Sequence, residues 1–135
     1  MTDRRALLDR LARLQGDLSS EQARAKAANS ACLNSIVEGR AYFRDTARGR
    51  LVGDENGFLK VIAWKANASA KYHTIIGVQI LGEGANELIQ MGSILIHSLA
   101  SIEQVSKTPF AAVTLSGLFQ VACDDALLAV KKRAN

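Results

Sequence analysis

Short stretches rich in Val, Ile, Phe and Tyr, separated by glycine-rich or polar residues, occupy the middle of this 135-residue chain. They are Ile36–Phe43, Arg48–Val52, Phe58–Trp64 and Ile75–Leu81, separated by Gly49, residues 53–57 and residues 67–73. Runs of this length and composition are typical of β-strands. Because the joining segments are too short to hold a crossover helix, neighbouring strands are expected to pair antiparallel. The pattern predicts a meander of about three or four strands.

Helical periodicity flanks this region on both sides. Residues 1–15 carry an apolar stripe and are expected to form an amphipathic N-terminal helix, ahead of a domain of residues 16–135 that begins with a second helix from Ser19. After the strands, three helices are expected over residues 87–100, 101–107 and 114–132. Residues 87–100 carry so little polar surface that we expect their helix at the centre of the core. The sequence therefore predicts an α+β fold, with helices covering one face of the antiparallel sheet.

Composition and charge exclude several classes of protein. A hydrophobic content of 48% is too high for a disordered chain. The net charge of +4 comes from dispersed Lys and Arg, and an aromatic content of 5% offers little for stacking on bases, so we expect no nucleic-acid partner. The longest apolar stretch is too short and too interrupted for a membrane span. Cys32 and Cys123 form no CxxC pair, which predicts neither a zinc site nor a disulfide framework and favours a reducing compartment, the cytoplasm or an organelle matrix.

A few polar residues could carry chemistry, and we expect none of them to do so. Gly82 to Glu87 has the glycine spacing of a dinucleotide-binding turn, but Glu87 replaces the third glycine and the preceding strand belongs to an antiparallel meander. His73 and His97 are expected to be structural residues. Cys123 precedes two aspartates, whose charges would raise its pKa and disfavour a reactive thiolate. The residues alone predict no catalytic centre and no metal site.

Several strings of the sequence match a known family in the expected order of elements. They are Glu38-Gly39-Arg40-Ala41-Tyr42-Phe43-Arg44-Asp45-Thr46-Ala47-Arg48-Gly49-Arg50-Leu51-Val52-Gly53, then Gly57-Phe58-Leu59-Lys60-Val61, Ile76-Gly77-Val78-Gln79-Ile80-Leu81-Gly82 and Ala85-Asn86-Glu87-Leu88-Ile89-Gln90-Met91-Gly92. The chain resembles the C-terminal dimerisation domain of the FAD-dependent pyridine nucleotide-disulfide oxidoreductases, and within that family it is similar to the soluble NAD(P) transhydrogenases. The resemblance extends from about Gly16 through Thr114-Leu115-Ser116 to Val121-Ala122-Cys123-Asp124-Asp125-Ala126-Leu127 in the last helix.

The resemblance implies an FAD/NAD-linked reductase dimerisation-domain fold that carries an extra N-terminal helix. It also implies that FAD and NAD(P) would be bound only by domains of a partner chain, because 135 residues leave no room for them here. Where relatives keep a His-Pro pair or Pro and an acidic residue, this chain has Ala112, Val113 and Gly117, none of which can transfer a proton. The family's first interface strand has no counterpart, so one sheet edge would need a cover.

Two hypotheses follow. The first is a non-catalytic protein-interaction or structural module, either a homodimer or an accessory subunit of a larger assembly, with no enzyme activity of its own. The helix of residues 87–100 and the last helix would then supply the interface, through Leu88, Met91, Leu95, Leu115, Leu118, Phe119 and Ala122. The second is that the chain is the dimerisation piece of a split FAD-dependent NAD(P) transhydrogenase or a related oxidoreductase. Against the second stands the loss of the proton-transfer positions.

Overall fold

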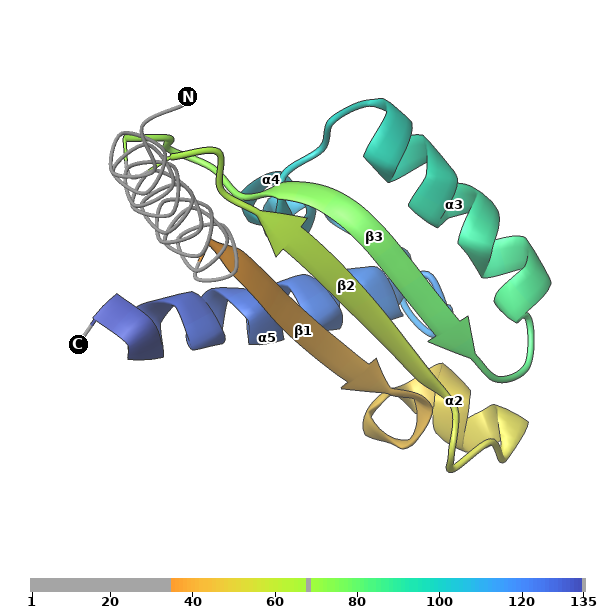
Figure 1. The fold of residues 1–135 in the computed structure, drawn as a ribbon. Helices are drawn as coiled ribbons and strands as arrows, with labels where there is room; N and C mark the ends of the chain where they lie inside the picture. The colour runs from red at the N-terminus through yellow and green to blue at the C-terminus, as the bar shows by residue number, and fades with distance from the viewer. Residues whose placement is uncertain (1–34, 68, 135) are drawn as a thin grey trace, which may run out of the picture. The chain divides into compact units, whose positions relative to one another are not determined.

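Three antiparallel strands form the sheet of this protein, as the computed structural model shows for residues 35–67 and 69–134 (Figure 1). The strands are β1 (Ile36–Tyr42), β2 (Phe58–Trp64) and β3 (Thr74–Leu81), in the order β1-β2-β3. Both neighbouring pairs are antiparallel, and a register shift between Ile62 and Ala63 interrupts the pairing of β2 with β3. The predicted meander is confirmed. The helices expected in residues 1–15 and from Ser19 lie outside the described residues.

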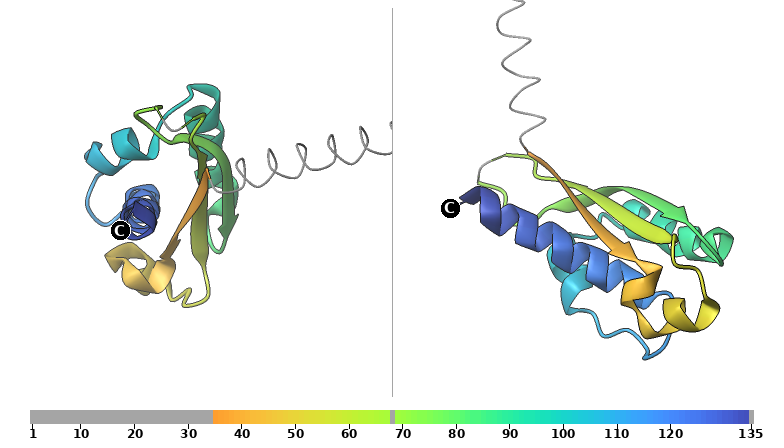
Figure 2. Two further views of the ribbon diagram at one scale, coloured as in Figure 1. Left: turned by 60° about the vertical axis from the view of Figure 1, so that its left-hand side comes forward. Right: turned by 90° about the horizontal axis from the view of Figure 1, so that it is seen from below.

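The helices α3, α4 and α5 follow the strands and cover one face of the sheet (Figure 2), whereas η1 and α2 lie between β1 and β2 in the chain. Their bounds are η1 (Phe43–Asp45), α2 (Ala47–Val52), α3 (Ala85–His97), α4 (Ile102–Lys107) and α5 (Gly117–Ala134). The longest helix, α5, lies against β1, α3 lies against β3, and α4 packs on α5. The fold is therefore the expected α+β arrangement.

Alternation along β2 shows which face of the sheet is buried. Leu59, Val61 and Ala63 are fully buried, while Lys60 and Ile62 between them are only half-buried. Because successive side chains of a strand point to opposite faces, the first set faces the helices and the second set faces away from them. The helix-facing set joins a core that α5 supplies with Leu118, Phe119, Ala122, Cys123 and Ala126.

The strand expected over Arg48–Val52 is wrong, because these residues form the helix α2. The hydroxyl of Thr46 accepts a hydrogen bond from the backbone N–H of Gly49 at 3.1 Å and so caps the helix N-terminus. At the other end Gly53 adopts the left-handed conformation that ends helices, with a φ of 78°. These local caps outweigh the β-propensity of a run this short.

The expectation that residues 87–100 form the centre of the core is also wrong. Only Leu88 and Gly92 of α3 are buried, and α5 occupies the central position instead. At Gly39 of β1, a Cβ atom would lie only 2.0 Å from the carbonyl oxygen of Ala122, so α5 approaches the strand backbone directly. Small residues at this crossing allow the close approach. A prediction of the central helix from the number of large apolar residues does not take such an approach into account.

Side chains of α5 also cover part of the outer edge of β1. The carbonyl oxygen of Ser35 and the backbone N–H of Phe43 are hydrogen-bonded toward β2. In an antiparallel pair only every second residue bonds to the neighbouring strand, so the residues that alternate with these two direct their backbone N–H and C=O groups to the outer edge of β1. The N–H of Arg40 donates to Asp125 Oδ2 at 2.9 Å, and Arg133 donates to the O of Ile36 at 2.7 Å. Side chains of α5 thereby satisfy part of the outer edge of β1.

Candidate interaction surfaces

The loop before α5 and the first residue of that helix hold Ala112, Val113 and Gly117, the three positions at which the family resemblance implied proton-transfer groups in relatives. Ala112 and Val113 are exposed, and Val113 adopts a positive φ of 59°. Gly117 is the first residue of α5, and a Cβ there would meet nothing within 4 Å. Methyl, isopropyl and hydrogen side chains can neither donate nor accept a proton. These three residues therefore supply no acid or base from this loop.

On α3, the predicted interface residues lie mostly on the inner side. Leu88 is 9% exposed, and Met91 and Leu95 are half-buried against the core. Leu115 packs at the start of the same helix, since its Cδ1 lies 3.4 Å from where a Cβ of Gly84 would be. The exposed apolar side chain of this helix is Ile94, at 66%. The sequence could have predicted that Ile94 is exposed, if Leu88 and Gly92 had been taken as the buried face of the helix.

Three of the predicted interface residues are misplaced. Leu118, Phe119 and Ala122 of α5 are fully buried in the protein's own core, so their side chains cannot contact a partner in this conformation. The prediction failed because an amphipathic stripe in the sequence does not show whether the protein's own core or a partner covers it. The apolar side chains that α5 does expose are Val121, at 40%, and Leu128, at 54%. Neither residue was among the predicted interface residues.

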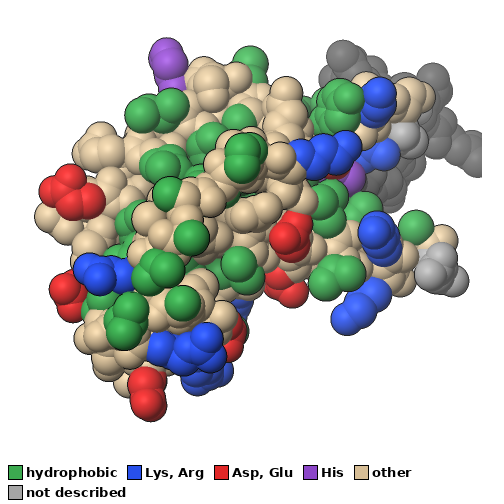
Figure 3. All heavy atoms as spheres, turned by 180° about the vertical axis from the view of Figure 1, so that it is seen from behind, with side chains coloured by type: hydrophobic (Ala, Val, Ile, Leu, Met, Phe, Trp, Pro, Cys, Tyr) green, Lys and Arg blue, Asp and Glu red, His purple; other side chains and the backbone are tan. Residues whose placement is uncertain are grey.

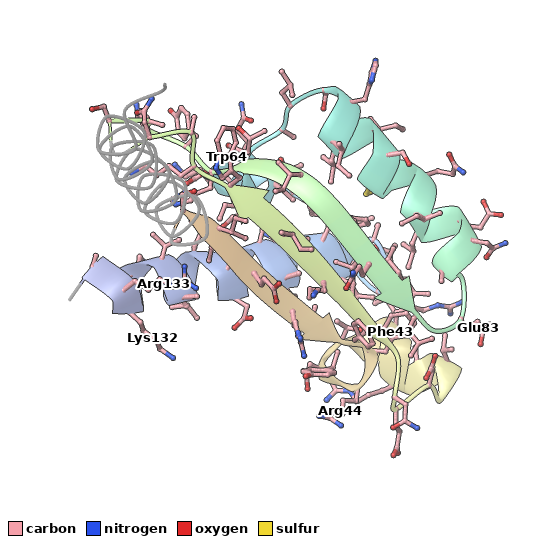
Figure 4. The ribbon with its side chains drawn as sticks, viewed as in Figure 1. Phe43, Arg44, Trp64, Glu83, Lys132 and Arg133 are labelled. Atoms are coloured by element: carbon pink, nitrogen blue, oxygen red, sulfur yellow. The ribbon has the colours of Figure 1, made fainter. Side chains whose placement is uncertain are left out.

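Charged residues flank these two exposed side chains. Asp124 and Asp125 lie between Val121 and Leu128 in the sequence, and Lys131 and Lys132 follow; all four are exposed. Figure 4 shows Lys132 directed away from the sheet and Arg133 directed toward β1. Figure 3 shows this side of the molecule, with hydrophobic side chains spread over its middle and charged side chains among and around them.

A groove of about 470 Å³ runs between the edge of β1 and α5. It is lined by Arg40, Tyr42, Asp45, Val121, Asp124, Asp125 and Leu128. A second hollow of about 360 Å³ lies beside α2 and is lined by Arg44, Gly49, Arg50, Gly53, Asp54 and Glu55. In the part of the chain that the structure describes, no three His, Cys, Asp or Glu side chains are grouped to hold a metal ion.

The face of the sheet that the described helices do not cover is partly apolar. Trp64 and Ile62 of β2 are half-buried on this face, and Figure 4 labels Trp64 near the end of the strand. Between the apolar ends lies an ion pair of Lys60 with Glu38, at 3.5 Å. Cross-strand pairs of opposite charge add only a few tenths of a kcal/mol at exposed sites.

The turn from β3 to α3 is closed by a carboxylate. Asp54 accepts hydrogen bonds from the N–H of Gly57 at 2.9 Å and from the N–H of Glu83 at 3.0 Å. Gly82 has a φ of 134°, and a Cβ there would lie 2.6 Å from Asp54 Oδ2. A fixed negative charge beside the start of α3 disfavours a second anion at that helix N-terminus. The turn therefore offers a poor site for a pyrophosphate.

His73 and Glu103 tie the start of β3 to α4. The Nδ1 of His73 lies 2.8 Å from Glu103 Oε1, and the backbone N–H of His73 also donates to Glu103. Burial favours a higher pKa for Glu103, but the hydrogen bonds from His73 and the local backbone outweigh it, and the pKa lies below its ordinary value. This pair is a structural link between two elements.

Burial, reinforced by the charges of Asp124 and Glu103, raises the pKa of the Cys123 thiol to about 12. The thiol is free and buried, so at neutral pH it is protonated. The expected lack of a reactive thiolate at this residue follows from its environment.

In the described residues, no helix is long and apolar enough to cross a membrane.

Comparison with known proteins connects this fold to a family. The family profile described as pyridine nucleotide-disulphide oxidoreductase, dimerisation domain, matches residues 18–123. The soluble pyridine nucleotide transhydrogenase of Hahella chejuensis is 28% identical over 87 residues, which is 62% of this chain and 18% of that protein. The soluble pyridine nucleotide transhydrogenase of Mycobacterium tuberculosis is 29% identical over 89 residues, 66% of this chain and 18% of that protein.

A third relative, the soluble pyridine nucleotide transhydrogenase of Pseudomonas putida, is 26% identical over 92 residues, which is 66% of this chain and 19% of that protein. The chain thus matches less than a fifth of the length of these curated relatives.

Proposed function

Because the chain belongs to the dimerisation-domain family of the pyridine nucleotide-disulphide oxidoreductases, we propose that it is a protein-interaction module without catalytic activity of its own. The observation that carries this proposal is the combination of a retained dimerisation fold with alkyl or hydrogen side chains at Ala112, Val113 and Gly117. A loop without an acid or a base cannot assist proton transfer in a neighbouring active site.

The surface of the described residues supports an interaction role. Ile94 on α3 and Leu128 on α5 are more than half exposed, and a partly apolar sheet face lies on the opposite side of the molecule. Large exposed apolar side chains are candidate contacts with another protein, and these three places are separate candidate surfaces. The partner is a second copy of this chain or a subunit of a larger assembly.

Analytical sizing and an affinity pull-down from native extract test the proposal together. The tagged chain is expected to elute as a homodimer, or to bring down a defined partner, without flavin absorbance and without transhydrogenase activity. Ile94→Lys is the test variant and Glu87→Lys is its control. Both substitutions add positive charge at exposed positions of α3, and only Ile94→Lys removes an apolar side chain. A strictly monomeric chain that captures no partner would contradict the proposal.

A second candidate is that the chain completes a split oxidoreductase, in which another chain binds FAD and NAD(P). It rests on one observation: the matched relatives are whole transhydrogenases, and this chain aligns with less than a fifth of each. Under this alternative, the pull-down would yield a yellow complex, and hydride transfer between NADH and an NADP analogue would require both chains. Full activity of the flavin-binding chain alone would exclude it.

A further inference from the structure

The exposed side of α5 carries a charge pattern that is complementary to itself in the reverse direction. Asp124 and Asp125 precede Lys131 and Lys132 by seven residues each. Seven residues span two helical turns, about 10 Å along the axis, so the opposite charges are too far apart to pair within one helix. Within the described residues, no ion pair involves any of the four.

Internal contacts show on which flank of the helix each charge lies. Asp125 accepts from the N–H of Arg40 and therefore lies on the flank toward β1, whereas Asp124 accepts from the hydroxyl of Ser106 and lies on the flank toward α4. A residue seven positions later returns to nearly the same direction. Lys132 therefore shares the flank of Asp125, and Lys131 shares the flank of Asp124. Leu128 lies between the flanks.

We propose that α5 pairs antiparallel with α5 of a second copy of this chain, around a two-fold axis close to Leu128. In such a pair each flank of one helix meets the same flank of its copy. Asp125 then faces Lys132 of the copy on one flank, and Asp124 faces Lys131 of the copy on the other. Two-fold symmetry repeats both contacts, which gives four complementary pairs around two apposed Leu128 side chains. This rests on the proposed interaction role and names the partner and the surface.

Within residues 35–67 and 69–134, the elements around α5 leave this part of the helix accessible. Leu128 is 54% exposed, and all four charged side chains are exposed. The C-terminal part of α5 runs past the end of the strands (Figure 2, right). The pairing leaves α3 available for another contact, because α3 lies against β3 at the other side of the sheet.

The pairing should be weak. A single pair of helices about three turns long buries less area than a standard protein interface, so we expect a dissociation constant on the order of 10 µM. Four exposed charge pairs contribute modestly one by one and are screened by salt. Turning all of them into repulsions should weaken the dimer at least about thirtyfold.

Charge reversal with sedimentation equilibrium tests the proposal on the full chain. Asp124→Lys with Asp125→Lys should give a monomer, and so should Lys131→Glu with Lys132→Glu. Mixed in equal amounts, the two variants should form a heterodimer, because every facing pair is again of opposite charge. Matched controls are Glu83→Lys with Glu87→Lys, and Arg48→Glu with Arg50→Glu, which change the net charge equally at exposed positions away from α5.

The lysine reversal also protects the test against misfolding. The side chains of Asp124 and Asp125 accept internal hydrogen bonds, whereas in the described structure the side chains of Lys131 and Lys132 make no hydrogen bond, and Leu128 has an apolar side chain. The lysine variant and Leu128→Glu should therefore keep the circular dichroism spectrum of the wild type while losing the dimer.

Three outcomes would overturn the pairing, and each leaves the wider interaction role separately testable. A wild-type chain that stays monomeric up to about 1 mM, far above the expected dissociation constant, refutes it. So does a dimer that resists both reversals, although that dimer would keep the interaction role and place the interface elsewhere. A monomer whose α5 variants lose a different protein in the pull-down would assign the surface to that protein.

Discussion

Replacing Gly39 with Ala should be among the most destabilising single substitutions in the sheet. The new Cβ would lie 2.0 Å from the O of Ala122 and 2.4 Å from the N of Ala126. Both atoms belong to the helix backbone, which cannot rotate aside as a side chain can. To restore an ordinary contact of 3.4 Å, α5 and β1 must separate by about 1.4 Å at this crossing.

The cost follows from the contacts that this separation loosens. A gap of about 0.5–1 Å already forfeits a quarter to a half of the dispersion energy across it. Overpacking of a core costs about 1–3 kcal/mol, and a clash with the backbone belongs at the upper end of that range. The loss of unfolded-state entropy from Gly to Ala returns about 0.4–1 kcal/mol. We therefore expect a net loss of about 2 kcal/mol in the free energy of unfolding.

Urea unfolding followed by circular dichroism measures this loss as a shift in the midpoint at constant slope. Gly117→Ala is the matched control, because a Cβ at the first residue of α5 meets nothing within 4 Å and Ala favours helix. We expect the control to be neutral or slightly stabilising. If Gly39→Ala lost less than about 0.5 kcal/mol, a level typical of surface substitutions, the close crossing of α5 over β1 would not exist.

Three further results are expected. Thr46→Ala should lower the free energy of unfolding by about 1 kcal/mol in the same urea assay, since the hydroxyl caps α2 through the N–H of Gly49; an unchanged midpoint would contradict the cap. Cys123 should resist iodoacetamide at pH 8 in the folded chain and react in urea, because it is buried with a pKa of about 12; mass spectrometry locates the label, and rapid native labelling would refute the burial. The pKa of Glu103 is lowered by folding, so its contribution to stability is present above its ordinary pKa of 4.5 and is lost as the pH falls through the folded value. Wild type should therefore exceed Glu103→Gln in stability at pH 6 and lose that advantage in more acidic urea titrations, whereas a constant difference would exclude the link to His73.

Local patterns were enough to predict most of the fold. The strands over residues 36–42, 58–64 and 74–81 were anticipated because their side chains alternate or are β-branched and aromatic, and short joins allow only antiparallel pairing. The helices α3, α4 and α5 follow from their apolar spacing. The exception was α2, where a side-chain cap on Thr46 and a left-handed Gly53 decide the conformation.

The candidate surfaces were predicted less well, for a related reason. Periodicity places Leu118 and Phe119 on one stripe of a helix, but it does not say whether the sheet or a partner covers that stripe. The exposure of Val121 and Leu128 can be recognised only once it is known that the opposite side of α5 is buried. The proposed pairing role of this surface rests on acidic and basic residues seven positions apart, and that spacing is present in the sequence.

Residue identity and short-range pattern account for the family, the antiparallel strands and the lack of proton-transfer side chains at residues 112, 113 and 117. These properties depend on residue identity and on neighbours within a few positions. The central position of α5, in place of α3, follows from the packing of distant segments, because it depends on how closely two backbones approach at Gly39 and Ala122. Packing depends on surfaces that are far apart in the sequence, and no local sequence pattern specifies how closely those surfaces approach each other.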